Sequence, residues 1–239
     1  MSFHGLRAVF FDLDGTLRHT RPIYADFFAE YVVGLGLPDS NDNRLRAMRW
    51  EHHYWAQSVD LLADLVAYPE METAFWQNYA RRRLIAFGCP PKRAEALSAQ
   101  VAGYIEANRQ PVGYLPEDVL PTLQALREQQ TLVGVISNRM GSLEDVLAEI
   151  GLDGLVDFSL ASGQLDSWKP DPAIFAHALD QLGMTPEQTI YVGDNYFADV
   201  VGARRAGIQP VLLDPRRIFH DPGCPVIDRI GAVLTLIEH

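Results

Sequence analysis

Short apolar runs alternate with helix-period stretches in the first and last parts of the chain. Arg7–Phe11 and Leu132–Ile136 have the length and apolar character of strands that are buried on both faces. Further short strands are expected at Thr189–Val192 and Gln209–Leu213, and a weaker one at Asp157–Ala161. Strands that alternate with helices favour a parallel sheet with helices on both faces. The pattern therefore predicts an α/β fold.

Four helices are predicted in these outer parts of the chain. They cover Glu117–Gln129, Ser142–Gly151, Asp171–Gly183 and 231–239. The second is expected to open with a capping box from Ser142 to Asp145. In the third, Asp171 is the expected N-cap and Pro172 occupies the first turn, as is typical of helix starts. The last is expected to close the fold.

The middle of the chain follows a different pattern. Residues 18–112 contain helix-period segments rich in aromatic residues and no convincing strand. Breakers separate these segments at Gly36–Pro38, Tyr68–Pro69, Cys89–Pro91 and Pro111–Gly113. We therefore expect an all-helical domain over 18–112, inserted after the first strand of an α/β core domain that comprises 1–17 and 113–239.

The composition is that of an ordinary globular protein and narrows the functional classes. Of the 239 residues, 48% are hydrophobic and 21% are charged, which suffices for a sizeable core. A formal net charge of −11 argues against nucleic acid as a partner, because a phosphate backbone requires a basic surface. No apolar run is long enough for a bilayer, and the first acidic residue comes too early for a signal peptide. We expect a cytoplasmic monomer or homodimer that does not act at a membrane.

Polar residues stand just beyond the apolar runs, where parallel α/β sheets bind their ligands. They are Asp12, Asp14, Gly15 and Thr16 after the first run, Ser137 and Asn138 after the second, Lys169 before the Asp171 helix, and Asp194 and Asp199 after the run ending at Val192. We predict that these four loops converge on one edge of the sheet. They would bring together carboxylates, one amine and a hydroxyl–amide pair.

These residue types suit the transfer of a phosphoryl group with the help of Mg²⁺. Clustered carboxylates repel one another unless a cation lies among them, and hard oxygen ligands suit Mg²⁺. Asp12 is placed to attack phosphorus and form an aspartyl-phosphate. Asp14 is placed to protonate the leaving oxygen and later to take a proton from water.

The other residues at this edge have supporting roles in the same hypothesis. Gly15 lets the backbone approach a phosphoryl group without an intervening Cβ. Thr16, the next residue, belongs to the same predicted phosphate-binding loop. Ser137 and Asn138 offer a hydroxyl and an amide to phosphoryl oxygens. Lys169 brings the compensating positive charge. A further carboxylate, Asp194, is the natural additional metal ligand.

Four segments of this chain resemble the four motifs of the haloacid dehalogenase superfamily. They are DLDGTL at Asp12–Leu17, the strand end at Ser137–Asn138, Lys169–Pro170, and GDNYFAD at Gly193–Asp199. The segments occur in the order of the family's motifs and cover most of the core. The helical insert resembles the C1-type cap of that superfamily.

The resemblance implies a Rossmann-like core with its first strand in the centre. It also implies that Asp12 is the nucleophile, that Asp14 is the acid and base, and that Asp12, the Asp14 carbonyl and Asp194 hold Mg²⁺. Asp199, also expected among the metal residues, would act through a water or by orienting Lys169. The cap would close over a small phosphorylated metabolite and select its leaving group.

Several other functions stay open at this stage. A phosphomutase of the β-phosphoglucomutase type would share all four motifs. A 2-haloacid dehalogenase needs no acid at the second position, so Asp14 argues against it. A phosphonatase would require a lysine from the cap, where Lys92 is the only one. A non-catalytic binding protein of this fold would be expected to lose Asp12 or Lys169, and both are present.

The helical insert contains features that are expected to be mainly structural. Neighbours on a helix point about 100° apart, so His52 and His53 are poorly arranged to bind one metal ion. Arg81–Arg83 spreads around its helix and is expected to form mainly a solvated face. The aromatic residues expected in the core of the insert are Trp50, Trp55, Phe75 and Trp76. Arg18–Arg21 follows the catalytic loop directly, and substrate contacts are expected there first.

Overall fold

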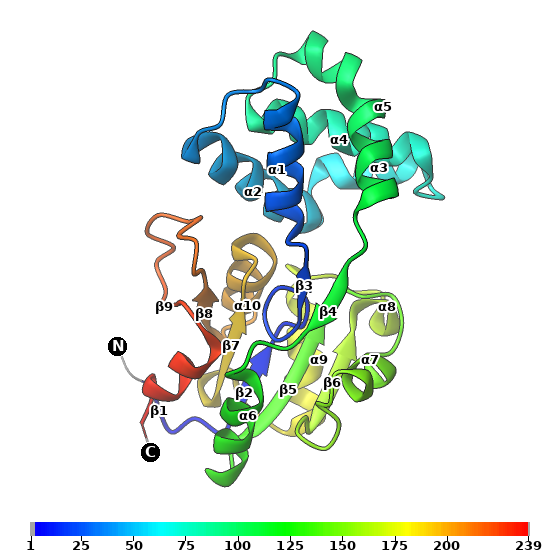
Figure 1. The fold of residues 1–239 in the computed structure, drawn as a ribbon. Helices are drawn as coiled ribbons and strands as arrows, with labels where there is room; N and C mark the ends of the chain where they lie inside the picture. Colours follow the sequence, from blue (N-terminus) through cyan, green and yellow to red (C-terminus); the bar gives the residue numbers. More distant parts are fainter. Residues whose placement is uncertain (1–2, 239) are drawn as a thin grey trace. The chain divides into compact units, whose positions relative to one another are not determined.

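The computed structural model describes residues 3–238, which form two compact units (Figure 1). One unit contains the residues up to His19 together with those from Tyr114 onward, and Thr20–Gly113 form the other. Two short strands, β3 (His19–Arg21) and β4 (Val112–Tyr114), pair where the chain passes from one unit to the other. The sequence did not predict them, because three residues are too few for a periodic signal.

A parallel sheet lies at the centre of the first unit. Among the described residues it has six strands, in the order β6 (Phe158–Ala161), β5 (Leu132–Ser137), β2 (Ala8–Phe11), β7 (Thr189–Gly193), β8 (Gln209–Leu213) and β9 (Val226–Ile227). Phe11 of β2 lies opposite Val135 of β5 and Val192 of β7. The carboxyl ends of the three central strands therefore meet at one edge of the sheet.

Alternate side chains of β2 contribute to two hydrophobic cores, one on each face of the sheet. Val9 and Phe11 belong to a cluster that includes residues of α6 (Val119–Glu128) and α7 (Glu144–Glu149). The intervening Ala8 and Phe10 belong to a second cluster with α9 (Pro172–Leu182) and α10 (Val201–Arg205). All four β2 side chains are fully buried. This burial explains the continuous apolar run in the sequence.

Two of the predicted helices differ in the structure. Leu143, whose side chain is buried in the core, is the N-cap of α7, and Ser142 Oγ accepts a hydrogen bond from the Glu144 N–H (3.2 Å) in place of a capping box. Over 231–239, of which 239 lies outside the described residues, the chain completes a 3₁₀ helix (Ile230–Thr235) and then forms β10 (Ile237–Glu238). Pairing of β10 with β1 (Phe3–His4) takes the place of the predicted closing helix.

Helices make up most of the second unit, Thr20–Gly113, all of which is described. They are α1 (Tyr24–Gly34), α2 (Asn41–Trp55), α3 (Val59–Ala67), α4 (Thr73–Phe87) and α5 (Pro91–Asn108). The sequence suggested one helix across the end of α2 and α3. The structure divides it, because Ser58 caps α3 by accepting a hydrogen bond from the Leu61 N–H (3.1 Å). Within residues 3–238, none of the helices combines the length and apolar character needed to cross a bilayer.

Candidate active site

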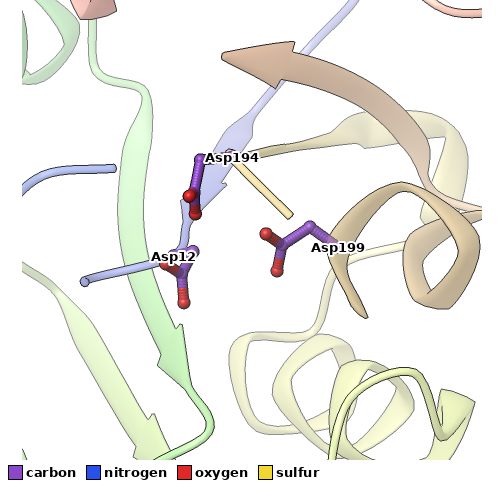
Figure 2. A group of neighbouring side chains, drawn as sticks. All are labelled: Asp12, Asp194 and Asp199. Atoms are coloured by element: carbon purple, nitrogen blue, oxygen red, sulfur yellow. The ribbon is translucent and has the colours of Figure 1, made fainter. Parts of the chain in front are cut away.

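The carboxylates predicted for the site gather at the carboxyl edge of the sheet. Asp12 follows β2, and its N–H donates to the Val192 carbonyl of β7 (2.9 Å). Asp194 follows β7, and Asp199 lies in the single turn of π-helix after it (Tyr196–Val200). One oxygen of each of the three carboxylates lies within 4.8 Å of the others. Figure 2 shows Asp12, Asp194 and Asp199 pointing toward a common region.

Lys169 is the buried cation of this cluster. Its Nζ donates to Asp12 Oδ1 at 2.6 Å and to Asp199 Oδ1 at 2.7 Å. The same nitrogen lies 2.8 Å from the Tyr191 hydroxyl and 3.1 Å from the Ile136 carbonyl oxygen. Burial by itself lowers the pKa of Lys169, but Asp12 and Asp199 outweigh it and the pKa lies well above its usual value. Lys169 is therefore a fixed positive charge at neutral pH.

Two of the carboxylates lack sufficient positive charge nearby. Burial raises the pKa of Asp12 to about 8, even though Lys169 opposes this effect. Burial and the neighbouring Asp199 raise the pKa of Asp194 to about 7. The charged form of each of these two carboxyl groups is therefore disfavoured by its surroundings in the protein. A further cation among them would favour the charged forms.

The donor set fits a divalent cation that prefers oxygen ligands. Asp12 and Asp194 each present carboxylate oxygens, and an added cation supplies the charge that this cluster lacks. Both oxygens of Asp199 are occupied, one by Lys169 and the other by the Asn195 N–H (2.9 Å). These contacts suit a residue that orients Lys169, and each oxygen of Asp199 keeps a further lone pair.

The turn after Asp14 packs closely against Asp194. Gly15 has a φ of +96°, and a Cβ at this position would lie 2.6 Å from Asp194 Oδ2. Thr16 is buried, and its hydroxyl is 3.4 Å from Asp194 Oδ1. Both residues thus help to position Asp194, in addition to the phosphate contacts that the sequence predicts for them.

The side chain of Asn138 makes hydrogen bonds within the protein that the sequence did not predict. Its Nδ2 donates to the Lys169 carbonyl (3.0 Å), and its Oδ1 accepts from the Lys169 N–H (2.8 Å) and the Ser162 hydroxyl (2.8 Å). The amide therefore ties the Lys169 loop to the end of β5. Ser137 is buried as the last residue of β5. Spacing in the sequence placed both residues at the right edge but could not show where their side chains point.

Two arginines hold the side chain of Asp14. Arg139 donates from Nε to Asp14 Oδ2 (2.6 Å) and from Nη2 to Oδ1 (2.9 Å), and Arg18 Nη1 donates to Oδ1 (2.9 Å). Arg139 was not among the site residues predicted from the sequence. The available signal was its position directly after Ser137–Asn138, at the end of a strand that leads into the site.

The run Arg81–Arg83 of the helical unit does not form a solvated face as predicted. Arg83 is 1% exposed, and its guanidinium pairs with Glu51 (2.8 Å). It also lies over the rings of Tyr24 (4.2 Å) and Phe28 (4.5 Å). The prediction was wrong for Arg83 because three consecutive residues span about 200° of a helix, and in α4 this arc reaches the buried side.

The other notable residues of the helical insert lie as follows. Phe75 is fully buried in an aromatic cluster that Trp50 and Trp55 pack against, whereas Trp76 is 43% exposed. In the described part of the chain, His52 and His53 belong to no group of three potential metal ligands. Within Arg18–Arg21, Arg18 contacts Asp14 and Thr20 Oγ1 accepts a hydrogen bond from Arg109 (3.2 Å).

Known proteins resemble this chain in sequence and in fold. A family model described as haloacid dehalogenase-like hydrolase matches residues 6–207. A phosphoserine phosphatase of Thermus thermophilus is 32% identical over 66% of this chain and 61% of its own. A phosphoglycolate phosphatase of Pasteurella multocida is 26% identical over 95% of this chain and 96% of its own. The crystal structure of a 2-haloacid dehalogenase from Pseudomonas syringae shares the fold, with a TM-score of 0.54 and 24% identity over 97% of both chains. For four of the curated relatives that it matches, this chain spans only 37% to 61% of their length.

Proposed function

Since the chain belongs to the haloacid dehalogenase-like hydrolases, we propose that it hydrolyses small phosphate monoesters through a phosphorylated Asp12, with Mg²⁺ as cofactor. The observation that carries this proposal is the buried contact of Asp12 with Lys169 (2.6 Å) beside Asp194 and Asp199. In this proposal, the carboxylate that acts as nucleophile lies next to a fixed positive charge. Two relatives named as phosphatases, a phosphoserine and a phosphoglycolate phosphatase, support an ester of phosphate as the substrate.

The reaction proceeds in two steps on the residues of this chain. In the first, a carboxylate oxygen of Asp12 attacks phosphorus, the ester P–O bond breaks, and Asp14 gives its proton to the leaving oxygen. In the second, water attacks the same phosphorus, Asp14 takes a proton from that water, and the bond to Asp12 breaks. The sum is an ester and water converted to an alcohol and inorganic phosphate.

Charge balance decides whether an anionic nucleophile can approach an anionic phosphoryl group. At about 3.5 Å and an effective dielectric constant of about 20, two unit charges interact by about 5 kcal/mol. Lys169 offsets this repulsion from its position beside Asp12. Asp12, Asp194 and the carbonyl of Asp14 would hold Mg²⁺, which supplies positive charge to the phosphoryl oxygens when bound.

The remaining residues of the site bind or position the phosphoryl group in this proposal. The backbone turn at Gly15–Thr16 and the hydroxyl of Ser137 provide donors for its oxygens. Asp199 keeps Lys169 in place through their 2.7 Å contact. The helical unit, predicted over 18–112, acts as the cap that selects the leaving group of a small phosphorylated metabolite.

The proposal is tested by replacing the nucleophile. Asp12→Asn should abolish Mg²⁺-dependent hydrolysis of p-nitrophenyl phosphate and the labelling of the protein by radioactive phosphate in rapid-quench experiments. Asp153→Asn is the matched control, because Asp153 is an exposed aspartate of the same unit. Retention of more than a few per cent of the wild-type rate in Asp12→Asn would show that Asp12 is not the nucleophile. Activity that survives complete chelation by EDTA would show that the reaction does not need Mg²⁺.

A further inference from the structure

The contact between Asp14 and Arg139 has the geometry of an orienting interaction. Two parallel N–H groups of one guanidinium meet the two oxygens of one carboxylate, at 2.6 and 2.9 Å, and Arg18 adds a third hydrogen bond at 2.9 Å. A bidentate contact of this kind fixes the plane of the carboxylate as well as its distance. The side chains of Asp14 and Arg139 are 40% and 36% exposed. Ion pairs this exposed contribute little to stability, so orientation is the larger consequence of the contact.

Both arginines are supplied from firmly held backbone. The carbonyl of Arg139 accepts a hydrogen bond from the Gly163 N–H (2.9 Å). A Cβ on Gly163 would lie 2.1 Å from the carbonyl oxygen of Met140, so the two backbones pack without room for a side chain. Arg18 closes a turn in which its N–H donates to the Leu13 carbonyl (2.7 Å). Asp14 is therefore held from two separate loops.

The three hydrogen bonds also determine which part of the Asp14 carboxylate is free. An ionised carboxylate has about four lone-pair sites for hydrogen bonds. Oδ1 accepts from both arginines, while Oδ2 accepts only from Arg139 Nε. One lone pair, on Oδ2, is left for a proton. The arginines thus fix the direction along which Asp14 donates or accepts a proton.

We propose that Arg139 is a positioning residue that orients Asp14 for proton transfer to the leaving group. This inference rests on the proposed phosphatase function and assigns a role to a residue outside the four motifs. Proton donation requires heavy atoms within hydrogen-bond reach and good alignment. Loss of Arg139 leaves Asp14 with a single contact to Arg18, which fixes neither the plane nor the rotation of its carboxylate.

The leaving group of the substrate separates this role from others. p-Nitrophenolate leaves without needing a proton, whereas the alkoxide of glycerol phosphate needs one. Arg139→Ala should therefore lower kcat/KM at least about 10-fold more for glycerol phosphate than for p-nitrophenyl phosphate, since general acid catalysis contributes about 10²–10⁴-fold. The decrease should lie in kcat, with KM nearly unchanged. Arg139→Lys should not restore the rate, because an ammonium group cannot make the bidentate contact.

Two further sets of variants make the test specific. In an Asp14→Asn background, Arg139→Ala should change kcat/KM for glycerol phosphate by less than about 2-fold, because a positioning residue has nothing left to position. Arg44→Ala is the matched control: Arg44 makes a similar bidentate contact with Asp39 (2.7 and 3.0 Å) in the helical unit. It should leave the rates for all substrates unchanged.

Each alternative outcome has a distinct meaning. Equal losses for both esters, or a full additional loss in the Asp14→Asn background, would overturn the proposal. Phosphoglycolate, whose leaving group has a carboxylate, is assayed as a third ester. A loss of activity confined to phosphoglycolate would also overturn the proposal and would show that Arg139 binds the carboxylate of that substrate. If the wild-type protein hydrolyses none of the three esters, the proposed function itself has failed.

Discussion

Replacement of Lys169 by methionine tests the charge balance of the site directly. Methionine has nearly the length of lysine but no charge and no N–H donor. The substitution removes contacts of 2.6 Å with Asp12 and 2.7 Å with Asp199, and it leaves the Tyr191 hydroxyl without its donor. Asp199 is 1% exposed, so water cannot replace the missing hydrogen bond without a rearrangement.

The cost of this change can be worked out from the geometry. At 2.6 Å and an effective dielectric constant of about 20, one ion pair is worth about 6 kcal/mol before desolvation is counted. Much of that gain is already offset by the burial of the charges, and removal of one partner from a buried pair costs about 3–5 kcal/mol in practice. We expect Lys169→Met to lower the free energy of unfolding by about 4 kcal/mol at pH 7.

Urea denaturation followed by circular dichroism measures this cost in protein freed of metal by EDTA. The double variant Asp12→Asn/Lys169→Met should recover part of the lost stability. Of the two carboxylates that contact Lys169, only that of Asp199 is then left without its cation. Lys169→Met should also lose most of its turnover. A destabilisation below about 1 kcal/mol at pH 7, or strict additivity of the two substitutions, would refute the assignment of Lys169 as the cation that holds this site together.

Two further predictions concern the glycine turn and the metal. Gly15→Ala should reduce activity at least about 10-fold, because its Cβ would lie 2.6 Å from Asp194 Oδ2. The control Gly5→Ala should lower only the Tm, because Gly5 has a φ of +70° but no atom lies within 4 Å of the added Cβ. Equal losses of activity in the two variants would contradict this explanation. In EDTA the Tm should fall as pH rises from about 4 to 8. Folding raises the pKa from 3.8 to about 8 for Asp12 and from 3.8 to about 7 for Asp194. The stability that these groups contribute is therefore full below their pKa in the unfolded chain and is lost as pH rises through their pKa in the folded protein. Mg²⁺ should then raise the Tm more at pH 8 than at pH 5, Asp194→Asn should weaken this pH dependence, and a Tm that rises with pH in EDTA would contradict the account.

The central strands were predictable because each is buried on both faces and reads as an unbroken apolar run. β2, β5 and β7 were found within one residue at their ends. The pairs β1–β10 and β3–β4 were not predicted, because strands of two or three residues show no period and depend on a partner far away in the chain. The break between α2 and α3 was missed because it depends on one capping hydroxyl, that of Ser58.

The site was predictable as a set of residue types at one edge, but its hydrogen bonds were not. Parallel strand ends bring Asp12 and Asp194 together wherever their side chains point. The direction of a side chain depends instead on partners from other loops. Asn138 turns to the Lys169 backbone, and Asp14 turns to Arg139, which is 125 positions away in the sequence. No local spacing carries that information.

The two glycines of the motifs have a common physical explanation in this structure. A Cβ on Gly15 would lie 2.6 Å from an oxygen of Asp194, and a Cβ on Gly193 would lie 2.3 Å from the carboxylate of Asp199. In each case, a carboxylate of the site fills the space of the missing side chain. Such close approach is unfavourable for crowded anions alone and becomes favourable when cations share them, as Lys169 does for two of the three. The pattern of a carboxylate beside a glycine therefore follows from packing several acids around positive charge in a small volume.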